Sequence, residues 1–344
     1  MLVLCILLLL IFTSCDRVEP SSPVEILFAP AVSAEYKGSP IDEKGDLRSF
    51  GVYSSRGSSS ITFGVDDGLV GFMENVKVGK TGEVWTSDPV CYWPVSSDYD
   101  VSFFAYTPYI ESPDFTANWG EKTISMQYTP AQDPLSQVDL MVAEPATDKY
   151  NETVSLSFDH ILTWVTFSAN YKGNLQSIKS SLELEDDIYL RVDELEVKNV
   201  VGTNSFSYRS TGSGWLPSDG LGRDASYKLS VNNLTLVNDS LSKVENVYKN
   251  LLSDQGALFL LPQSIVGNTS LIGVTFSYVN KKTHSTITQF YSEITLPGSV
   301  WSQGKKIRYN FTIDVTSSTL INITPIEVEP WVNSGNTPPE VNIK

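Results

Sequence analysis

The sequence has 344 residues, enough for two medium-sized domains with cores of their own. Its 40 acidic and 24 basic residues give a net charge of -16, which argues against a nucleic-acid partner. Aromatic residues make up 11% and charged residues only 19% of the chain, as in a folded protein rather than a disordered one.

The chain begins with an apolar run that ends at Phe12 and is followed by Thr-Ser and Cys15. The run has the length of a signal-peptide core and is too short to cross a bilayer. Its end is similar to a bacterial lipobox, in which the cysteine is acylated and becomes the new N-terminus. We therefore expect a lipoprotein signal peptide over 1–14, lipidation of Cys15 and a tether over 15–23. No Lys or Arg precedes the run, and an ordinary secretory signal is the alternative.

Cysteine usage leaves little room for disulfides. Cys5 leaves with the signal peptide and Cys15 carries the lipid, so Cys91 stands alone in the mature chain. Its neighbours, VCYWPV, resemble a strand, and we expect Cys91 to be buried there as a small hydrophobic residue.

Alternation of apolar and polar residues predicts half-buried strands of antiparallel sheets. Gly, Pro, Asn and Ser clusters separate these segments at short intervals, as in β-sandwiches. Three segments show the alternation most clearly, and their expected buried faces are Val154, Leu156 and Phe158; Ile272, Val274, Phe276 and Tyr278; and Ile307, Tyr309, Phe311, Ile313 and Val315.

One helix is predicted, because apolar residues recur at helical spacing after Asp239-Ser240 and Gly256 follows the expected end. A polar, proline-containing stretch near residue 150 predicts a domain boundary there. The sequence thus indicates an all-β chain with an N-terminal domain over 24–150 and a C-terminal domain over 151–344, the latter ending in a loose appendage. The residues on the apolar face of the predicted helix are Leu241, Val244, Tyr248, Leu251 and Leu252.

Residues that could support catalysis are sparse. The two histidines, His160 and His284, are not in metal-binding or triad spacing, and we expect His160 to be a packed or hydrogen-bonded strand residue. The acidic clusters at Asp66 and Asp67 and over Glu183–Asp187 are expected to be solvated turns and strand ends. A calcium site at either cluster is the less favoured alternative. We expect no catalytic residue, no cofactor and no transition-metal site. Seven dispersed tryptophans favour core positions over sugar stacking: Trp85, Trp93, Trp119, Trp164, Trp215, Trp301 and Trp331.

Eight segments in order resemble the fimbrillins, the subunits of type V pili of Gram-negative anaerobes. The resemblance covers the whole length, and its strength lies in the order of the segments rather than in any one of them. The segments are VEILFAPAVS (24–33), SFGVYSS (49–55), FMENVKV (72–78), VWTSDPVCYWPVSSDYDVSFFAYTPY (84–109), QVDLMVA (137–143), VSLSFDHILTWVTFSA (154–169), FLLPQS (259–264) and WSQGKKIRYNFTIDV (301–315), with Pro330-Trp331 near the end.

The resemblance implies two transthyretin-like antiparallel β-sandwich domains in tandem, export to the outer membrane as a lipoprotein, and surface exposure in a fimbria. Family members are cleaved after an arginine in the loop that follows the first strand, which removes the anchor and that strand together. A donor strand of a neighbouring subunit then fills the vacated groove. Arg48 matches the cleavage position, and Arg56 is the second candidate.

The first strand offers Val24, Ile26 and Phe28 on one face, and the C-terminal segment has similar alternation. The alternative for that segment is that it pairs within its own domain. The implied partners are other pilin subunits, the outer membrane through the lipid, and a host or bacterial surface glycan or protein receptor. The candidate donor-strand residues are Ile321, Ile323, Ile326 and Val328.

Three other functions stay open at this point. An anchor or accessory lipoprotein of the pilus would keep its first strand and its lipid. A glycan-binding adhesin would need two or three tryptophans on one face of a shallow groove. A glycoside hydrolase would need two carboxylates roughly 5–9.5 Å apart in a cleft, and the resemblance to a structural family makes this function the least favoured.

Overall fold

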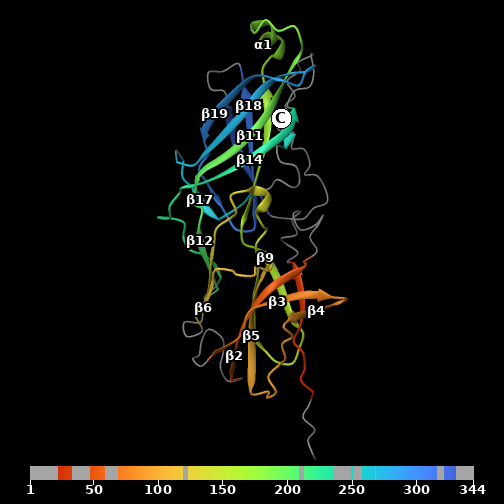
Figure 1. The fold of residues 1–344 in the computed structure, drawn as a ribbon. Coiled ribbons are helices and arrows are strands. Elements are labelled where there is room, and N and C mark those ends of the chain that lie inside the picture. Colours follow the sequence, from red (N-terminus) through yellow and green to blue (C-terminus); the bar gives the residue numbers. More distant parts are fainter. Residues whose placement is uncertain are drawn as a thin grey trace, which may run out of the picture.

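The structure, a computed structural model, describes residues 22–32, 47–58, 69–118, 123–208, 213–235, 249–250, 258–267, 269–315 and 321–330. These residues form an elongated, mostly β molecule in which the first strands lie at one end and the last strands at the other (Figure 1). The expectation of an all-β fold with antiparallel sheets and little helix is confirmed.

The first half contains the strands β1 (Leu27–Val32), β2 (Ser49–Ser58), β3 (Val70–Thr81), β4 (Val84–Asp88), β5 (Tyr99–Thr107), β6 (Phe115–Asn118), β7 (Thr123–Tyr128), β8 (Met141–Lys149) and β9 (Val154–His160), and the short 3-10 helix η2 (Pro134–Ser136). The second half contains β10 (Thr163–Lys172), α1 (Leu175–Ser181), β11 (Ile188–Val200), β12 (Asn204–Tyr208), β13 (Gly214–Trp215), β14 (Ala225–Thr235), β15 (Lys249–Asn250), β16 (Leu258–Leu260), β17 (Gln263–Ile265), β18 (Leu271–Asn280), β19 (Thr286–Thr295), β20 (Ser299–Trp301), β21 (Lys305–Asp314) and β22 (Ile321–Pro330).

The N-terminal lobe is one closed sheet with the strand order β1-β4-β3-β2-β5-β8-β9. Its pairs are antiparallel except for β1 and β9, which run parallel and close the sheet. The predicted inward face of β9 is confirmed, since Val154, Leu156 and Phe158 are all buried. These residues share a core with inward residues of β1, β2 and β5.

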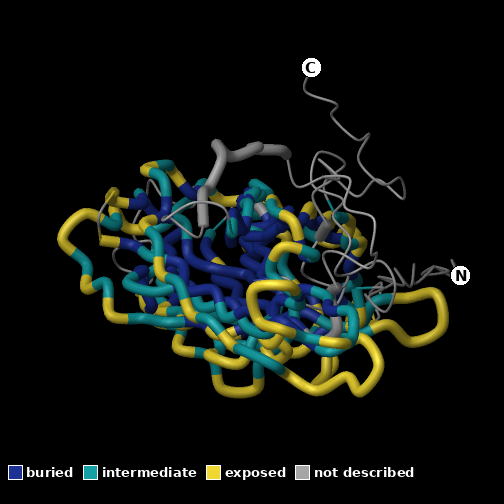
Figure 2. The backbone as a smooth tube through the Cα atoms, turned by 90° about the horizontal axis from the view of Figure 1, so that it is seen from above, coloured by how far each residue is buried: buried dark blue, intermediate teal, exposed yellow. Residues whose placement is uncertain are grey.

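The C-terminal lobe contains two facing sheets, of order β15-β10-β21-β22 and β14-β11-β18-β19, with β16 paired to β10. Both contribute to one large core. The predicted faces are confirmed, except that Val315 lies just beyond β21 and is only partly buried. Figure 2 shows the buried residues running along the interior, with exposed segments around them. The confirmed buried residues are Ile272, Val274, Phe276, Tyr278, Ile307, Tyr309, Phe311 and Ile313.

The expected domain boundary near residue 150 falls inside the N-terminal sheet. β9 begins at Val154, beyond that boundary, yet it pairs with both β1 and β8. A further sheet of order β13-β12-β7-β6 joins strands from both sides of the boundary. The polar stretch around residue 150 is a turn between two strands of one sheet, and sequence polarity alone does not separate such a turn from a linker.

The single α-helix of the described residues is α1, not the predicted helix at 241–252. Asn174 caps α1, because its side-chain oxygen accepts hydrogen bonds from the backbone N–H groups of Gln176 and Ser177. Most of the predicted helix lies outside the described residues. Its residues Lys249–Asn250 form β15 and pair with β10, so the helical prediction is wrong there. No helix in the described ranges is long and apolar enough to span a membrane.

Candidate functional site

The first strand fills the space between β4 and β9. It pairs antiparallel with β4 through Leu27 with Thr86 and Phe28 with Trp85, and parallel with β9 from Phe28 through Val32. Just before the strand, the Ile26 N–H donates to the Cys91 carbonyl at 2.9 Å. Among the described strands, β1 alone connects β4 to β9, so the closure of this sheet depends on it.

Two side chains of the first strand anchor it in the core. Ile26 is 0% exposed and Phe28 is 3% exposed. The Phe28 ring meets Phe50 and Phe103 edge to face, with centroids 5.7 and 5.8 Å away. The expectation that Val24 shares this buried face is wrong, because it is 49% exposed and lies ahead of the paired part of the strand.

The floor beneath β1 comes from residues that the sequence analysis did not assign to a site. Phe50 on β2, Phe103 on β5 and Leu156 on β9 are all buried there. Alternation indicates that such residues face inward, but not which of them lie under one particular strand. That information comes from the pairing of segments far apart in the chain.

Arg48 is exposed and directly precedes β2. All described strands other than β1 begin after it, so a cut at Arg48 would separate β1 from the rest of the fold. Arg56, the second candidate for cleavage, lies within β2 and pairs on both sides, with Val70 and with Val101. Its guanidinium also lies 5.9 and 5.8 Å from the rings of Phe72 and Tyr99. Arg48 is exposed and precedes β2, whereas Arg56 lies inside β2, so the structure favours cleavage at Arg48 over Arg56.

The C-terminal strand β22 pairs antiparallel with β21 of its own chain and lies at the edge of the sheet. Ile321 and Ile323 stand opposite Ile313 and Phe311, and Val328 stands opposite Ile307. An irregularity between Arg308 and Asn310 divides this pairing into two parts. Ile326 lies within β22, and the role of these residues as a donor strand stays a prediction.

His160 is a buried member of β9, and its Nδ1 lies 2.7 Å from Asp139 Oδ1. The prediction that it is a packed, hydrogen-bonded strand residue is confirmed. His284 is exposed in the turn between β18 and β19.

In the acidic stretch Glu183–Asp187, the carboxylates of Asp186 and Asp187 are bound by other side chains of the protein. Asp187 lies 2.9 Å from the Lys179 ammonium, whose hydrogen bond and charge hold the pKa of Asp187 below its usual range. Asp186 accepts a hydrogen bond from Asn280. No group of three potential ligands gathers around a metal position within the described ranges. Asp66 and Asp67 lie outside those ranges, as does Cys15.

The described tryptophans pack against protein groups. Trp93 and Trp301 are buried, and Trp85 lies against Phe50. Trp164 lies against Phe259 and beneath the Lys306 ammonium, and Trp215 packs on Phe206. Trp119 and Trp331 fall outside the described residues.

Cys91 differs from its predicted place. It is half-buried rather than buried and follows β4 outside any strand. Its N–H donates to Ser87 Oγ at 2.9 Å, and its thiol lies 3.5 Å from the Pro89 carbonyl. The aromatic neighbours that suggested a strand belong to an irregular segment, which pairs with the chain before β1 through Tyr92 and Glu25.

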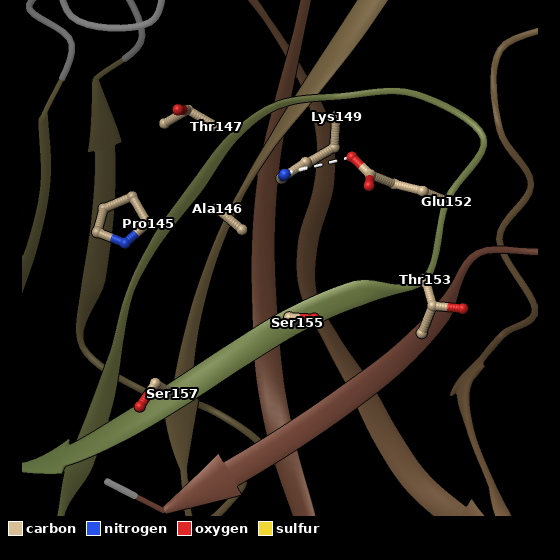
Figure 3. Close-up of a pocket in the computed structure, with 8 residues that line it drawn as sticks. All are labelled: Pro145, Ala146, Thr147, Lys149, Glu152, Thr153, Ser155 and Ser157. Atoms are coloured by element: carbon tan, nitrogen blue, oxygen red, sulfur yellow. Dashed lines mark ion pairs between the residues drawn. The ribbon is translucent and has the colours of Figure 1, made fainter.

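A shallow polar hollow of about 400 Å³ lies on the outer face of β8 and β9 (Figure 3). Lys149 and Glu152 form an ion pair across one side of it, with 3.2 Å between Nζ and Oε1. Ser155 and Ser157 project into it from β9, the strand beside β1. The other lining residues are Pro145, Ala146, Thr147 and Thr153.

Several solved structures are similar to this chain in fold, and two from Bacteroides illustrate the likeness. One, a fimbrial protein from Bacteroides vulgatus ATCC 8482, is 18% identical with a TM-score of 0.62, and the match covers 90% of this chain and 99% of that one. The other, a candidate cell adhesion protein from Bacteroides ovatus ATCC 8483, is 15% identical with a TM-score of 0.50, and covers 91% and 99%. At these identities the likeness concerns the fold. No curated protein matches the sequence.

A family model provides the assignment. The model described as "Fimbrillin-like" matches residues 43–331, which is most of the chain and includes every described strand of both lobes except β1. This confirms the resemblance seen in the eight ordered segments. The chain belongs to the fimbrillin-like family.

Proposed function

We propose that this protein is a structural subunit of a surface fimbria and assembles by donor-strand exchange after its first strand is removed. Membership of the fimbrillin-like family supports a fimbrial role. So does the fold likeness to a Bacteroides fimbrial protein. A structural rather than an enzymatic role follows from the same family membership.

One observation carries the proposal: the only described strand before Arg48 is the strand that closes the N-terminal sheet. A cut after Arg48 removes β1 and leaves the strands from β2 onward continuous in the chain. The unpaired edges of β4 and β9 and the rings of Phe50 and Phe103 would then form what we call the acceptor groove. A strand of another subunit can satisfy the same backbone groups and refill the same core.

The energetic scale is sufficient for a durable junction. Burying Ile26 and Phe28 contributes about 1.5–3 kcal/mol of free energy for each side chain. Removal of β1 gives up this free energy, and a strand that refills the groove with apolar side chains recovers it. These figures are an upper estimate, because the reference chain is taken as fully extended. A donor strand also restores backbone hydrogen bonds along two edges, which raises specificity for an extended segment.

Export and anchoring complete the proposal. Acylation of Cys15 and removal of residues 1–14 would hold the precursor in the outer membrane by more than one acyl chain, which gives a stable anchor. Cleavage at Arg48 would separate the subunit from Cys15 and release it into the fimbria. An uncleaved subunit of the same fold would instead act as an anchor or accessory lipoprotein.

The test is to cut the purified chain with limited trypsin and examine it on gels in mild SDS without heating. The cut protein is expected to begin at Ser49 and to form ladders, whereas a chain in which Lys37, Lys44 and Arg48 are all replaced by alanine, so that trypsin cannot cut between β1 and β2, should do neither. A cut chain that stays monomeric at high concentration would overturn polymerisation by this route. Intact mass of the protein taken from the cell surface separates the pilin from the uncleaved anchor.

A further inference from the structure

Aromatic rings rather than carboxylates surround the charge of Arg56. The central carbon of its guanidinium lies 5.9 Å from the centre of the Phe72 ring and 5.8 Å from that of Tyr99. No ion pair or side-chain hydrogen bond joins this group to another residue in the part of the chain that the structure describes. Arginine stacks on aromatic faces and binds carboxylates through paired hydrogen bonds. Phe72, Arg56 and Tyr99, which we call the arginine cluster, therefore present N–H donors to an incoming ligand.

The arginine cluster lies at the end of the N-terminal sheet that is farther from the C-terminal lobe. β5 begins at Tyr99 and ends at Thr107, whose partner Met141 pairs in turn with His160 at the end of β9. The chain then enters the C-terminal lobe with β10. β5 is 9 residues long, so about 30 Å separates its two ends. The N-terminal strands form one end of the elongated molecule (Figure 1), and there Tyr99 is 44% and Val70 55% exposed.

A buried hydroxyl without a partner lies on the same strand, two residues inward of Arg56. Ser54 and Arg56 share one face of β2, because they stand opposite Phe103 and Val101, two buried residues of the N-terminal core. Ser54 is 0% exposed, and its Oγ has no hydrogen-bond partner among the described residues. The pairing of β2 with β3 is irregular on both sides of Ser54, as is common at barrel rims beside binding sites. Buried hydroxyls are nearly always hydrogen-bonded, so this one indicates a donor kept for a ligand.

We propose that the arginine cluster binds an acidic sugar residue. Arg56 pairs with the sugar carboxylate, the exposed Tyr99 ring and Val70 lie against its C–H groups, and the Ser54 hydroxyl donates to an oxygen of the ligand. The ends of closed sheets are frequent places for small-ligand sites. The inference adds an adhesive function to the structural one and depends on neither cleavage nor assembly.

The strand pairing favours a sugar over a peptide. β2 pairs with β3 on one side and with β5 on the other, so an extended peptide finds no free strand edge on β2. An exposed aromatic ring beside an aliphatic side chain offers instead a flat apolar surface with a polar tip. A pyranose that carries a carboxylate matches both the surface and the cation.

The charge of the whole chain makes such binding a local property. At a net charge of -16 the protein repels acidic molecules in general, so an acidic sugar that binds must be held by nearby groups. Asp100 follows Tyr99 in β5 and therefore stands on the opposite face of the sheet. Arg56 thus meets the ligand without a carboxylate of β5 on the same face.

The test is a titration of the purified, uncleaved chain, followed by NMR, with methyl glucuronide, a methyl sialoside and the neutral methyl glucoside. Both acidic glycosides, or one of them, are expected to bind, and the glucoside at least about tenfold more weakly. Arg56→Gln should weaken binding of the acidic glycoside by about tenfold, and Ser54→Ala by several-fold. Lys80→Gln removes the same charge from an exposed position near the other end of β3 and should stay within about twofold of wild type. Thermal melts show which variants are folded.

Arg56→Lys is the second variant, in case Arg56→Gln does not fold. It keeps the charge but cannot form the paired hydrogen bonds, and it should also lose most of the affinity. Equal binding of the glucoside, or an equal loss in Lys80→Gln, would overturn carboxylate recognition by Arg56. Binding of a Glu-rich peptide without binding of either acidic glycoside would overturn the sugar. A folded wild-type chain that binds neither acidic glycoside would overturn the site, and the ladders of the cut chain test fimbrial assembly separately.

Discussion

Phe28 on β1 meets Phe103 on β5 edge to face, with ring centroids 5.8 Å apart and ring planes at 89°. The two residues belong to strands that are not neighbours in the sheet, so the contact crosses the interior of the closed N-terminal sheet. It connects the strand proposed for removal to the floor that a replacement strand would have to cover.

Replacing Phe28 with alanine is expected to lower the free energy of unfolding by about 3–5 kcal/mol, because the change leaves a cavity in a fully packed region. Urea denaturation measures the loss. Ala29→Ser is the matched control, since Ala29 is the next residue on the same strand and is exposed; its effect should stay within about 0.5 kcal/mol. Equal effects of the two variants would mean that β1 is not anchored through Phe28.

Sequence alternation predicted the fold class and most of the buried faces because a half-buried strand records its orientation in every second residue. It could not indicate that β1 pairs with β9, because that contact joins segments more than a hundred residues apart. The same reason explains the predicted domain boundary near residue 150. The strand β9 follows that polar turn in the chain, yet it pairs within the N-terminal sheet. The helical spacing of apolar residues predicted a helix that includes residues 249–250, but these two residues form a strand that pairs with β10.

The candidate site was predictable only in part. Arg48 is exposed just before a strand, as its polar surroundings indicated. Arg56 was the second candidate in the sequence, and its pairing on both sides and its two aromatic neighbours set it further apart.

Arg48→Ala is expected to abolish the trypsin product that begins at Ser49, and Arg56→Ala is expected to leave it unchanged. The physical reason is that Arg56 is held in a paired strand, whereas Arg48 precedes one. N-terminal sequencing and intact mass identify the product. A first cut after Arg56 in the wild-type chain would show that β2 opens more readily than its pairing implies.

Cys15→Ser is expected to remove lipid labelling and to release the protein from membranes or to stall it as a precursor. The thiol is the acyl acceptor in a lipobox, and serine cannot replace it. Labelling with an alkyne fatty acid, followed by membrane fractionation, measures both effects. Cys91→Ser is the matched control and should keep the label, because Cys91 lies within the folded part of the chain after β4, where its N–H donates to Ser87 Oγ. An unlabelled wild-type protein would rule out lipidation.

Alkaline conditions should destabilise the C-terminal lobe in a defined window. Burial raises the pKa of Tyr227 and of Tyr278 from 10.0 to about 12. A folded-state pKa above the unfolded value means that this stability is fully present below pH 10 and is lost as the pH rises to about 12. Thermal melts between pH 9 and 12 should show Tm falling over that range. Tyr227→Phe should make the decrease of Tm with pH smaller. A Tm that does not change between pH 9 and 12 would contradict the raised pKa values of these tyrosines.

Deleting residues 321–344 is expected to abolish SDS-resistant ladders while leaving cleavage at Arg48 intact. The deletion removes β22 and with it the candidate donor residues Ile321, Ile323, Ile326 and Val328, whereas Arg48 and β1 lie in the other lobe. Because β22 is an edge strand, β10 and β21 can still pair with each other and the C-terminal core keeps its two sheets. A chain lacking only residues 331–344 is the matched control and should still form ladders. Circular dichroism and a thermal melt of each deletion report whether the truncated chain is folded. Ladders that survive loss of 321–344 in a folded, cleaved chain would place the donor strand elsewhere in the sequence, because none of the candidate donor residues would remain.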